Sequence, residues 1–118
     1  MSFRSAHSFE TRSAEARRIQ EKFPGRVPVI VERAATTKSV PLIDKQKFLV
    51  PGDMTLGQFI YVIRTRMRLG SEQALFCFIR NSLPTASLLM KELYASYKED
   101  DGFVYATYCG ENTFGLMV

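Results

Sequence analysis

The residues best suited to covalent chemistry in this 118-residue chain are two cysteines and one histidine. Cys77 and Cys109 would act as nucleophiles only beside a base, and His7 is the one histidine available for that role. Cys77 lies in the apolar run 75–79, where a thiol usually packs as a small hydrophobic group. No cluster has metal-ligand spacing, and no glycine-rich phosphate loop follows a predicted strand. We therefore predict a protein that is not an enzyme and uses no cofactor or metal.

Positive charge is concentrated in the first part of the chain. Residues 1–47 hold ten Lys and Arg against five Asp and Glu, a balance of +5, whereas residues 48–118 hold six against seven, a balance of −1. A basic surface attracts acidic peptides, anionic membranes or nucleic acid. For any single basic residue, the simpler interpretation is a solvated cation on the surface.

Three segments have the periodicity of amphipathic helices. The first covers residues 8–23, where Ser8 is suited to the N-cap. The second follows Thr55, which opens a capping box, and is predicted to stop at Gly70. The third covers residues 86–97. These helices must support whatever site the chain carries.

Four segments read as strands: 26–33, 48–51, 74–80 and 103–109. The third is almost entirely apolar, which predicts burial on both faces, and the second is expected to have one open edge. Two strands before a long helix and two after it predict an α+β domain with a mixed sheet that this helix covers on one face. The first helix must then pack on the opposite face or along an edge. This order of elements is that of the ubiquitin-like β-grasp.

Four stretches closely resemble, in order and almost without gaps, the GABARAP-type ubiquitin-like modifiers of autophagy. They are FPGRVPVIVE (23–32), DKQKFLVPGDMT (44–55), GQFIYVIRTR (57–66) and DGFVYATYCGENTFG (101–115). The resemblance runs from about Phe9 to Gly115. It implies a β-grasp with a four-stranded mixed sheet and extra N-terminal helices. Its expected parts are a packed helical extension (1–24), the ubiquitin-like domain (25–110) and a flexible tail (111–118).

The resemblance further implies that the chain is attached to lipid. A processing cysteine protease would cut after Gly115, next to Phe114, and remove residues 116–118. Activating and conjugating enzymes would then pass Gly115 to phosphatidylethanolamine. Glycine suits these steps because its carboxyl group must enter narrow active sites as an adenylate and a thioester, where a side chain on Cα would collide. Such a protein would be cytoplasmic and, when lipidated, on the autophagosomal membrane.

A groove for short peptides is the second activity that the resemblance implies. Cargo receptors would dock an aromatic residue, two variable residues and an aliphatic one by adding a strand to an exposed sheet edge. The residues expected to line the aromatic pocket are Glu15, Ile19, Pro28, Lys47, Leu49 and Phe103. Those expected to line the aliphatic pocket are Phe48, Val50, Pro51, Met54, Phe59 and Val62. Those expected to attract acidic flanking residues are Arg26, Lys45, Lys47 and Arg66. An ordinary core is the competing interpretation of the apolar residues, and it is strongest for Phe59.

Two other functions stay open from the residues alone. Aromatic strands such as Phe103-Val104-Tyr105 are superficially similar to the stacking platforms of nucleic-acid-binding domains. However, no RNA-binding signature is present, and the basic residues fall on predicted helices and a loop, so we expect no nucleic-acid partner. The other alternative is a peptide-binding scaffold of the same fold that is never lipidated.

Overall fold

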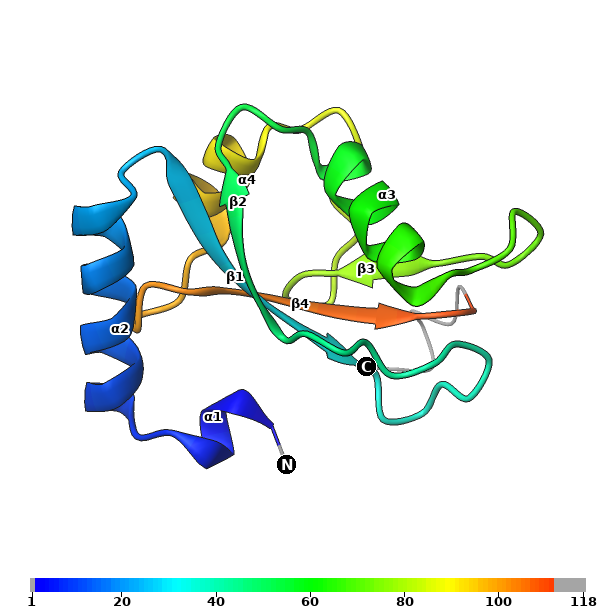
Figure 1. The fold of residues 1–118 in the computed structure, drawn as a ribbon, viewed down its shortest axis with the longest axis horizontal. Coiled ribbons are helices and arrows are strands. Elements are labelled where there is room, and N and C mark those ends of the chain that lie inside the picture. Colours follow the sequence, from blue (N-terminus) through cyan, green and yellow to red (C-terminus); the bar gives the residue numbers. More distant parts are fainter. Residues whose placement is uncertain (1, 112–118) are drawn as a thin grey trace.

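The structure, a computed structural model, describes residues 2–111 and is built around a four-stranded sheet in the order β2-β1-β4-β3 (Figure 1). In it, β1 (Arg26–Arg33) pairs antiparallel with β2 (Lys47–Pro51) and parallel with β4 (Val104–Cys109). β4 also pairs antiparallel with β3 (Phe76–Phe78). The predicted mixed sheet is confirmed, and β2 is one of its two edges.

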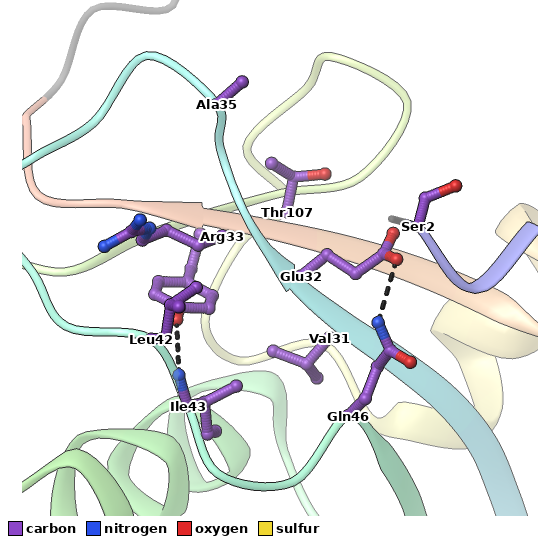
Figure 2. A pocket seen from close by; sticks show the side chains of 10 residues that line it. Ser2, Val31, Glu32, Arg33, Ala35, Leu42, Ile43, Gln46 and Thr107 are labelled. Carbon is purple, nitrogen blue, oxygen red and sulfur yellow. Dashed lines mark hydrogen bonds between the residues drawn. The ribbon is translucent and has the colours of Figure 1, made fainter. Parts of the chain in front are cut away.

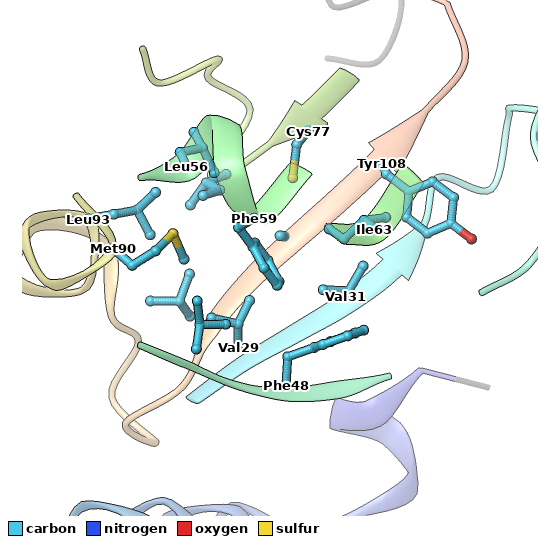
Figure 3. Close-up of a cluster of buried hydrophobic side chains, with 14 of the residues drawn as sticks. Val29, Val31, Phe48, Leu56, Phe59, Ile63, Cys77, Met90, Leu93 and Tyr108 are labelled. Atoms are coloured by element: carbon cyan, nitrogen blue, oxygen red, sulfur yellow. The ribbon is translucent and has the colours of Figure 1, made fainter. Parts of the chain in front are cut away.

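One face of the sheet is covered by α3 (Leu56–Met67) and α4 (Met90–Tyr97). The capping box at Thr55 is present, because its side chain accepts a hydrogen bond from the Gln58 amide while Gln58 accepts one from the Thr55 amide. Figure 3 shows the main core on this face, where the apolar stripe of α3 meets the inward side chains of the strands. The helix predicted to cover the sheet therefore does so.

The opposite face is covered by α1 (Phe3–Ala6) and α2 (Phe9–Lys22), as Figure 1 shows. Ser8 caps α2, as predicted, by accepting a hydrogen bond from the Thr11 amide. Ile19 of α2 packs in a second, smaller core cluster with residues of β1 and β4. The first predicted helix thus docks on the face that α3 leaves open.

A buried polar contact fastens α2 to the sheet. The Asp101 side chain is 2% exposed and accepts hydrogen bonds from Arg12 Nη1 at 2.9 Å and from the Tyr105 hydroxyl at 2.5 Å. It also accepts one from the Phe103 amide at 2.9 Å. Burial, and then the bond to Asp101, raise the pKa of Tyr105, so its hydroxyl keeps the proton that it donates.

Three sequence-based boundaries were wrong. The helix predicted from residue 86 begins at Met90, because residues 86–88 instead accept hydrogen bonds at the start of α3: the Ala86 carbonyl from Gly57 and the Leu88 carbonyl from Leu56. The strand predicted over 74–80 is limited to Phe76–Phe78. The second predicted helix stops before Gly70, because Arg68 adopts a left-handed conformation, with φ of 58°, and caps it.

Candidate peptide-docking site

β2 presents free backbone groups along its outer side. The Val31 amide donates a hydrogen bond to the Gln46 carbonyl at 2.8 Å. This bond fixes which opposite residues of β1 and β2 are joined by backbone hydrogen bonds. Because antiparallel pairs alternate, the backbone groups of Lys47 and Leu49 point away from β1. Pro28, which lies opposite Leu49, has no amide hydrogen to donate and fits this register. Lys47 and Leu49 are therefore placed to pair with a further strand.

Arg26 partly covers that edge. Its Nη1 donates a hydrogen bond to the Leu49 carbonyl at 3.1 Å, and its side chain is exposed. A single contact of this kind on the surface contributes little net free energy, because water replaces it readily. The guanidinium group is thus available for exchange with another partner.

The residues predicted for the aromatic pocket lie together on the α2 side of this edge. Half-buried Leu49 packs against the cluster that contains Ile19 and Phe103. Lys47 forms an ion pair with Glu15 of α2, which joins the edge strand to that helix. Pro28 is buried beside Leu49, and Phe103 has no exposed surface, so their part in lining a pocket stays a prediction.

The residues predicted for the aliphatic pocket divide into two sets. Pro51, Met54 and Val62 line an open hollow of about 800 Å³ between β2 and α3. By contrast Phe48, Val50 and Phe59 belong to the main core, and Figure 3 shows Phe48 and Phe59 next to each other there. Their ring centroids are 5.5 Å apart in an edge-on arrangement. The competing core interpretation therefore describes Phe59 well, whereas its part in a pocket stays a prediction.

Basic side chains stand at both ends of β2. Lys45 Nζ lies 5.2 Å and Arg66 Cζ 5.9 Å from the centre of the Phe48 ring. Arg66 Nε also donates to Asp44 Oδ1 at 2.7 Å. Arg26 stands at the opposite end, where it pairs in register with Pro51. The predicted cations thus surround the free edge rather than being scattered over the surface.

Tyr61 is a lining residue that the sequence analysis missed. It is 69% exposed and lines the hollow with Val62, one position further along α3. The signal was its place beside Val62 off the apolar stripe of that helix, because neighbouring apolar side chains left in solvent can mark a contact surface.

A second hollow, of about 550 Å³, lies beyond the start of β2, where the loop 41–46 diverges from β1 (Figure 2). Tyr108 anchors this loop, since its hydroxyl accepts from the Ile43 amide at 2.9 Å and donates to the Pro41 carbonyl at 2.8 Å. Glu32 holds the same loop by accepting from Gln46 Nε2 at 3.0 Å. These contacts fix the approach of the chain to the free edge.

The cysteines are poorly placed for nucleophilic chemistry. Burial raises the pKa of Cys77 to about 12, whereas reactive thiols have a lowered pKa. Cys77 lies in the core on the α3 face, while His7 packs against Phe3 on the α2 face. The sheet therefore separates Cys77 from His7. Burial also raises the pKa of Cys109, so neither thiol has the lowered pKa of a reactive cysteine.

The aromatic strand is not a platform for stacking bases. Phe103 and Val104 have no exposed surface, and Tyr105 is tied to Asp101. Base stacking needs exposed ring faces.

Among residues 2–111, no helix is long and apolar enough to cross a bilayer.

The order of the strands and the helix across one face of the sheet define a ubiquitin-like protein. The family described as "Autophagy protein Atg8 ubiquitin like" matches residues 11–115. Autophagy-related protein 8a of Arabidopsis thaliana is 53% identical, over 98% of this chain and 94% of that protein. Autophagy-related protein 8 of Mycosarcoma maydis is also 53% identical, over 98% and 97%. The crystal structure of Trypanosoma brucei ATG8 superposes with a TM-score of 0.88 at 38% identity, covering 94% of this chain and 95% of that one.

The chain belongs to the Atg8 family of ubiquitin-like autophagy proteins. Both the predicted fold and the predicted resemblance are thereby confirmed. The protein is a ubiquitin-like modifier of autophagy.

Proposed function

We propose that this modifier is trimmed after Gly115 and joined through that residue to phosphatidylethanolamine. A processing cysteine protease removes residues 116–118, and activating and conjugating enzymes carry out the transfer. The protein is cytoplasmic before these steps and on the autophagosomal membrane after them. The observation that supports this proposal is the extent of the family match, which ends at residue 115. Gly115 and Phe114 lie outside the described residues.

Intact-mass spectrometry of the protein purified from its own cells tests the proposal. The expected species have lost Leu116-Met117-Val118, and a membrane-bound fraction has gained one phospholipid. A protein that keeps all 118 residues in every fraction would instead identify a peptide-binding scaffold that is never lipidated.

We further propose that the free edge of β2 binds short peptides with an aromatic residue and, three positions later, an aliphatic residue. The peptide backbone forms hydrogen bonds with the backbone groups of Lys47 and Leu49 that point away from β1. Its aromatic side chain packs beside Leu49, and its aliphatic side chain enters the hollow lined by Met54 and Val62. Pairing at the Leu49 carbonyl displaces Arg26, which then binds an acidic residue of the peptide.

Lys47→Glu is expected to weaken binding of an acidic-flanked motif peptide roughly fivefold, mainly through a slower on-rate. Lys47 is half-buried at the edge and paired with Glu15, so the change places two carboxylates together and repels an acidic ligand. Calorimetry at low and high salt measures the effect. Lys38→Glu makes the same change in charge at an exposed loop position and serves as the control. Equal affinities for the two variants would contradict the site.

Leu49→Ala is expected to lower peptide affinity roughly tenfold, as expected for an anchor contact of a binding site. Leu49 is half-buried, so its truncation should cost less than the ~2–5 kcal/mol typical of a fully buried leucine. Denaturant unfolding and peptide titration separate the two effects. Leu75→Ala, at a half-buried leucine packed against the main core, is the matched control. A large stability loss with unchanged affinity would make Leu49 a core residue only.

A further inference from the structure

The end of β4 is fastened to the loop 34–40. Thr37 of that loop is 1% exposed, although its side chain is polar. Its Oγ1 accepts a hydrogen bond from the Gly110 amide at 3.1 Å and donates one to Glu111 Oε2 at 3.2 Å. A buried hydroxyl that is used in both directions holds its two partners in a fixed arrangement.

The Glu111 carboxylate has a second donor in the same loop, the hydroxyl of Ser39. Hydrogen bonds to an ionised carboxylate are stronger than those between neutral groups. In addition, Cys109 Sγ donates to the Glu111 carbonyl at 3.0 Å. The last residue that the structure describes is therefore held through both its side chain and its backbone.

Gly110 packs closely against the loop, so that a side chain at this position would require Ser39 and Val40 to shift. A Cβ atom at residue 110 would lie 3.0 Å from Val40 Cγ1 and 3.2 Å from Ser39 Cβ, and would overlap the Ser39 hydroxyl. Steric fit is independent of the hydrogen bonds, and it holds the same residues in place. We call Thr37, Ser39, Gly110 and Glu111 the C-terminal clamp.

We infer that the C-terminal clamp positions the tail for trimming and lipid transfer, an inference that rests on the function proposed for Gly115. Gly115 is only four positions beyond Glu111 in the sequence. Because the clamp holds the residue from which the tail starts, it limits the positions that the scissile bond can take. It also lowers the entropy cost that an enzyme would otherwise meet in ordering this part of the chain. Thr37 and Ser39 are thus positioning residues for a reaction that takes place several residues away.

Steady-state cleavage of the full chain by a purified processing cysteine protease of the family tests the clamp. The double variant Thr37→Val with Ser39→Ala removes both hydroxyls and nearly preserves their volume. Without the clamp, the protease must order about one further residue of the chain, which lowers its affinity for the chain about tenfold. KM should therefore rise roughly tenfold while kcat changes little. Thr37→Ser keeps the hydroxyl and should restore a KM close to that of the unaltered chain.

Two further measurements separate positioning from general damage to the fold. Peptide affinity at β2 should stay unchanged in the double variant, and amide exchange at Gly110 should become faster. Ser39→Ala alone, at an exposed residue, should raise KM without unfolding the protein. The inference would be overturned by an unchanged KM in both the double variant and Ser39→Ala. Equal KM values for the single variants Thr37→Val and Thr37→Ser would also overturn it. An unaltered chain that the protease does not cut would overturn both this inference and the function proposed for Gly115.

Discussion

Gly115→Ala is expected to abolish trimming and lipid attachment, with losses of at least roughly 100-fold in the rate of each. The expectation follows from the need of the glycine carboxyl group to pass through narrow active sites, where a methyl group on Cα displaces the reacting carbonyl. A displacement of about 1 Å is sufficient for an effect of this size. Intact mass measures trimming, and gel mobility with membrane fractionation measures lipid attachment.

Gly25→Ala is the matched control for this experiment. A Cβ atom at Gly25 would meet no atom within 4 Å, so the same change should leave folding, trimming and lipid attachment intact. The Gly115→Ala variant should also bind motif peptides normally, because its altered residue is far along the chain from β2. Normal membrane recruitment of Gly115→Ala would contradict the proposed conjugation.

Asp101→Ala should produce the largest stability loss, about 3 kcal/mol, because it leaves the Phe103 amide and the Tyr105 hydroxyl without their acceptor. Arg12 loses its carboxylate partner as well. The Arg12 side chain is 14% exposed and that of Asp101 is 2% exposed, so water cannot readily replace the lost contacts. For a chain of this length the melting temperature should fall by roughly 10 °C. Denaturant unfolding gives the free energy directly. Peptide affinity should fall as well, because α2 carries Glu15 and Ile19 of the aromatic pocket.

Asp100→Ala is a suitable comparison, since Asp100 is the exposed neighbour of Asp101. Its free energy of unfolding should stay close to that of the unaltered chain. Arg12→Met in the Asp101→Ala background should recover part of the lost stability by removing the unpaired cation. A loss below about 1 kcal/mol for Asp101→Ala would mean that the contact behaves as an ordinary surface ion pair.

Local signals predicted most of the fold. Ser8 and Thr55 each mark a helix start that the structure reproduces, since capping depends on residues within one turn. The apolar alternation of β1 and β4 placed both strands within a residue or two. The order of the elements predicted a mixed sheet with one helix across it, and the resemblance to a known family added the four-stranded β-grasp and its extra N-terminal helices.

Boundaries set by tertiary contacts could not be predicted in the same way. The segment before α4 has helical periodicity, yet its carbonyl groups bond to the start of α3, and a long-range contact of this kind has no local signature. The same is true of Asp101, which the sequence indicates only as part of a turn before Gly102. Its partner Arg12 lies 89 residues away.

The candidate site was predicted less completely than the fold. Position along β2 indicated that Leu49 and Phe48 point to opposite faces, and the structure places them so. It could not indicate that Phe48 and Phe59 pack against each other in the core. Nor could it indicate that Arg26 occupies the Leu49 carbonyl, because an exposed side chain of this length has many rotamers available.

The parallel pairing of β1 with β4 has a consequence for how the chain folds. The two central strands are the first and the last in the sequence, so the register Val29 to Val104 joins residues 75 positions apart. Closing so long a loop is entropically costly before any contact compensates, and domains with such pairings fold slowly. Until β4 arrives, the apolar faces of β1 and α3 are left without their partner strand. The chain is therefore expected to fold in one late, cooperative step, and a shortened form that ends before Val104 should aggregate rather than persist as a stable fragment.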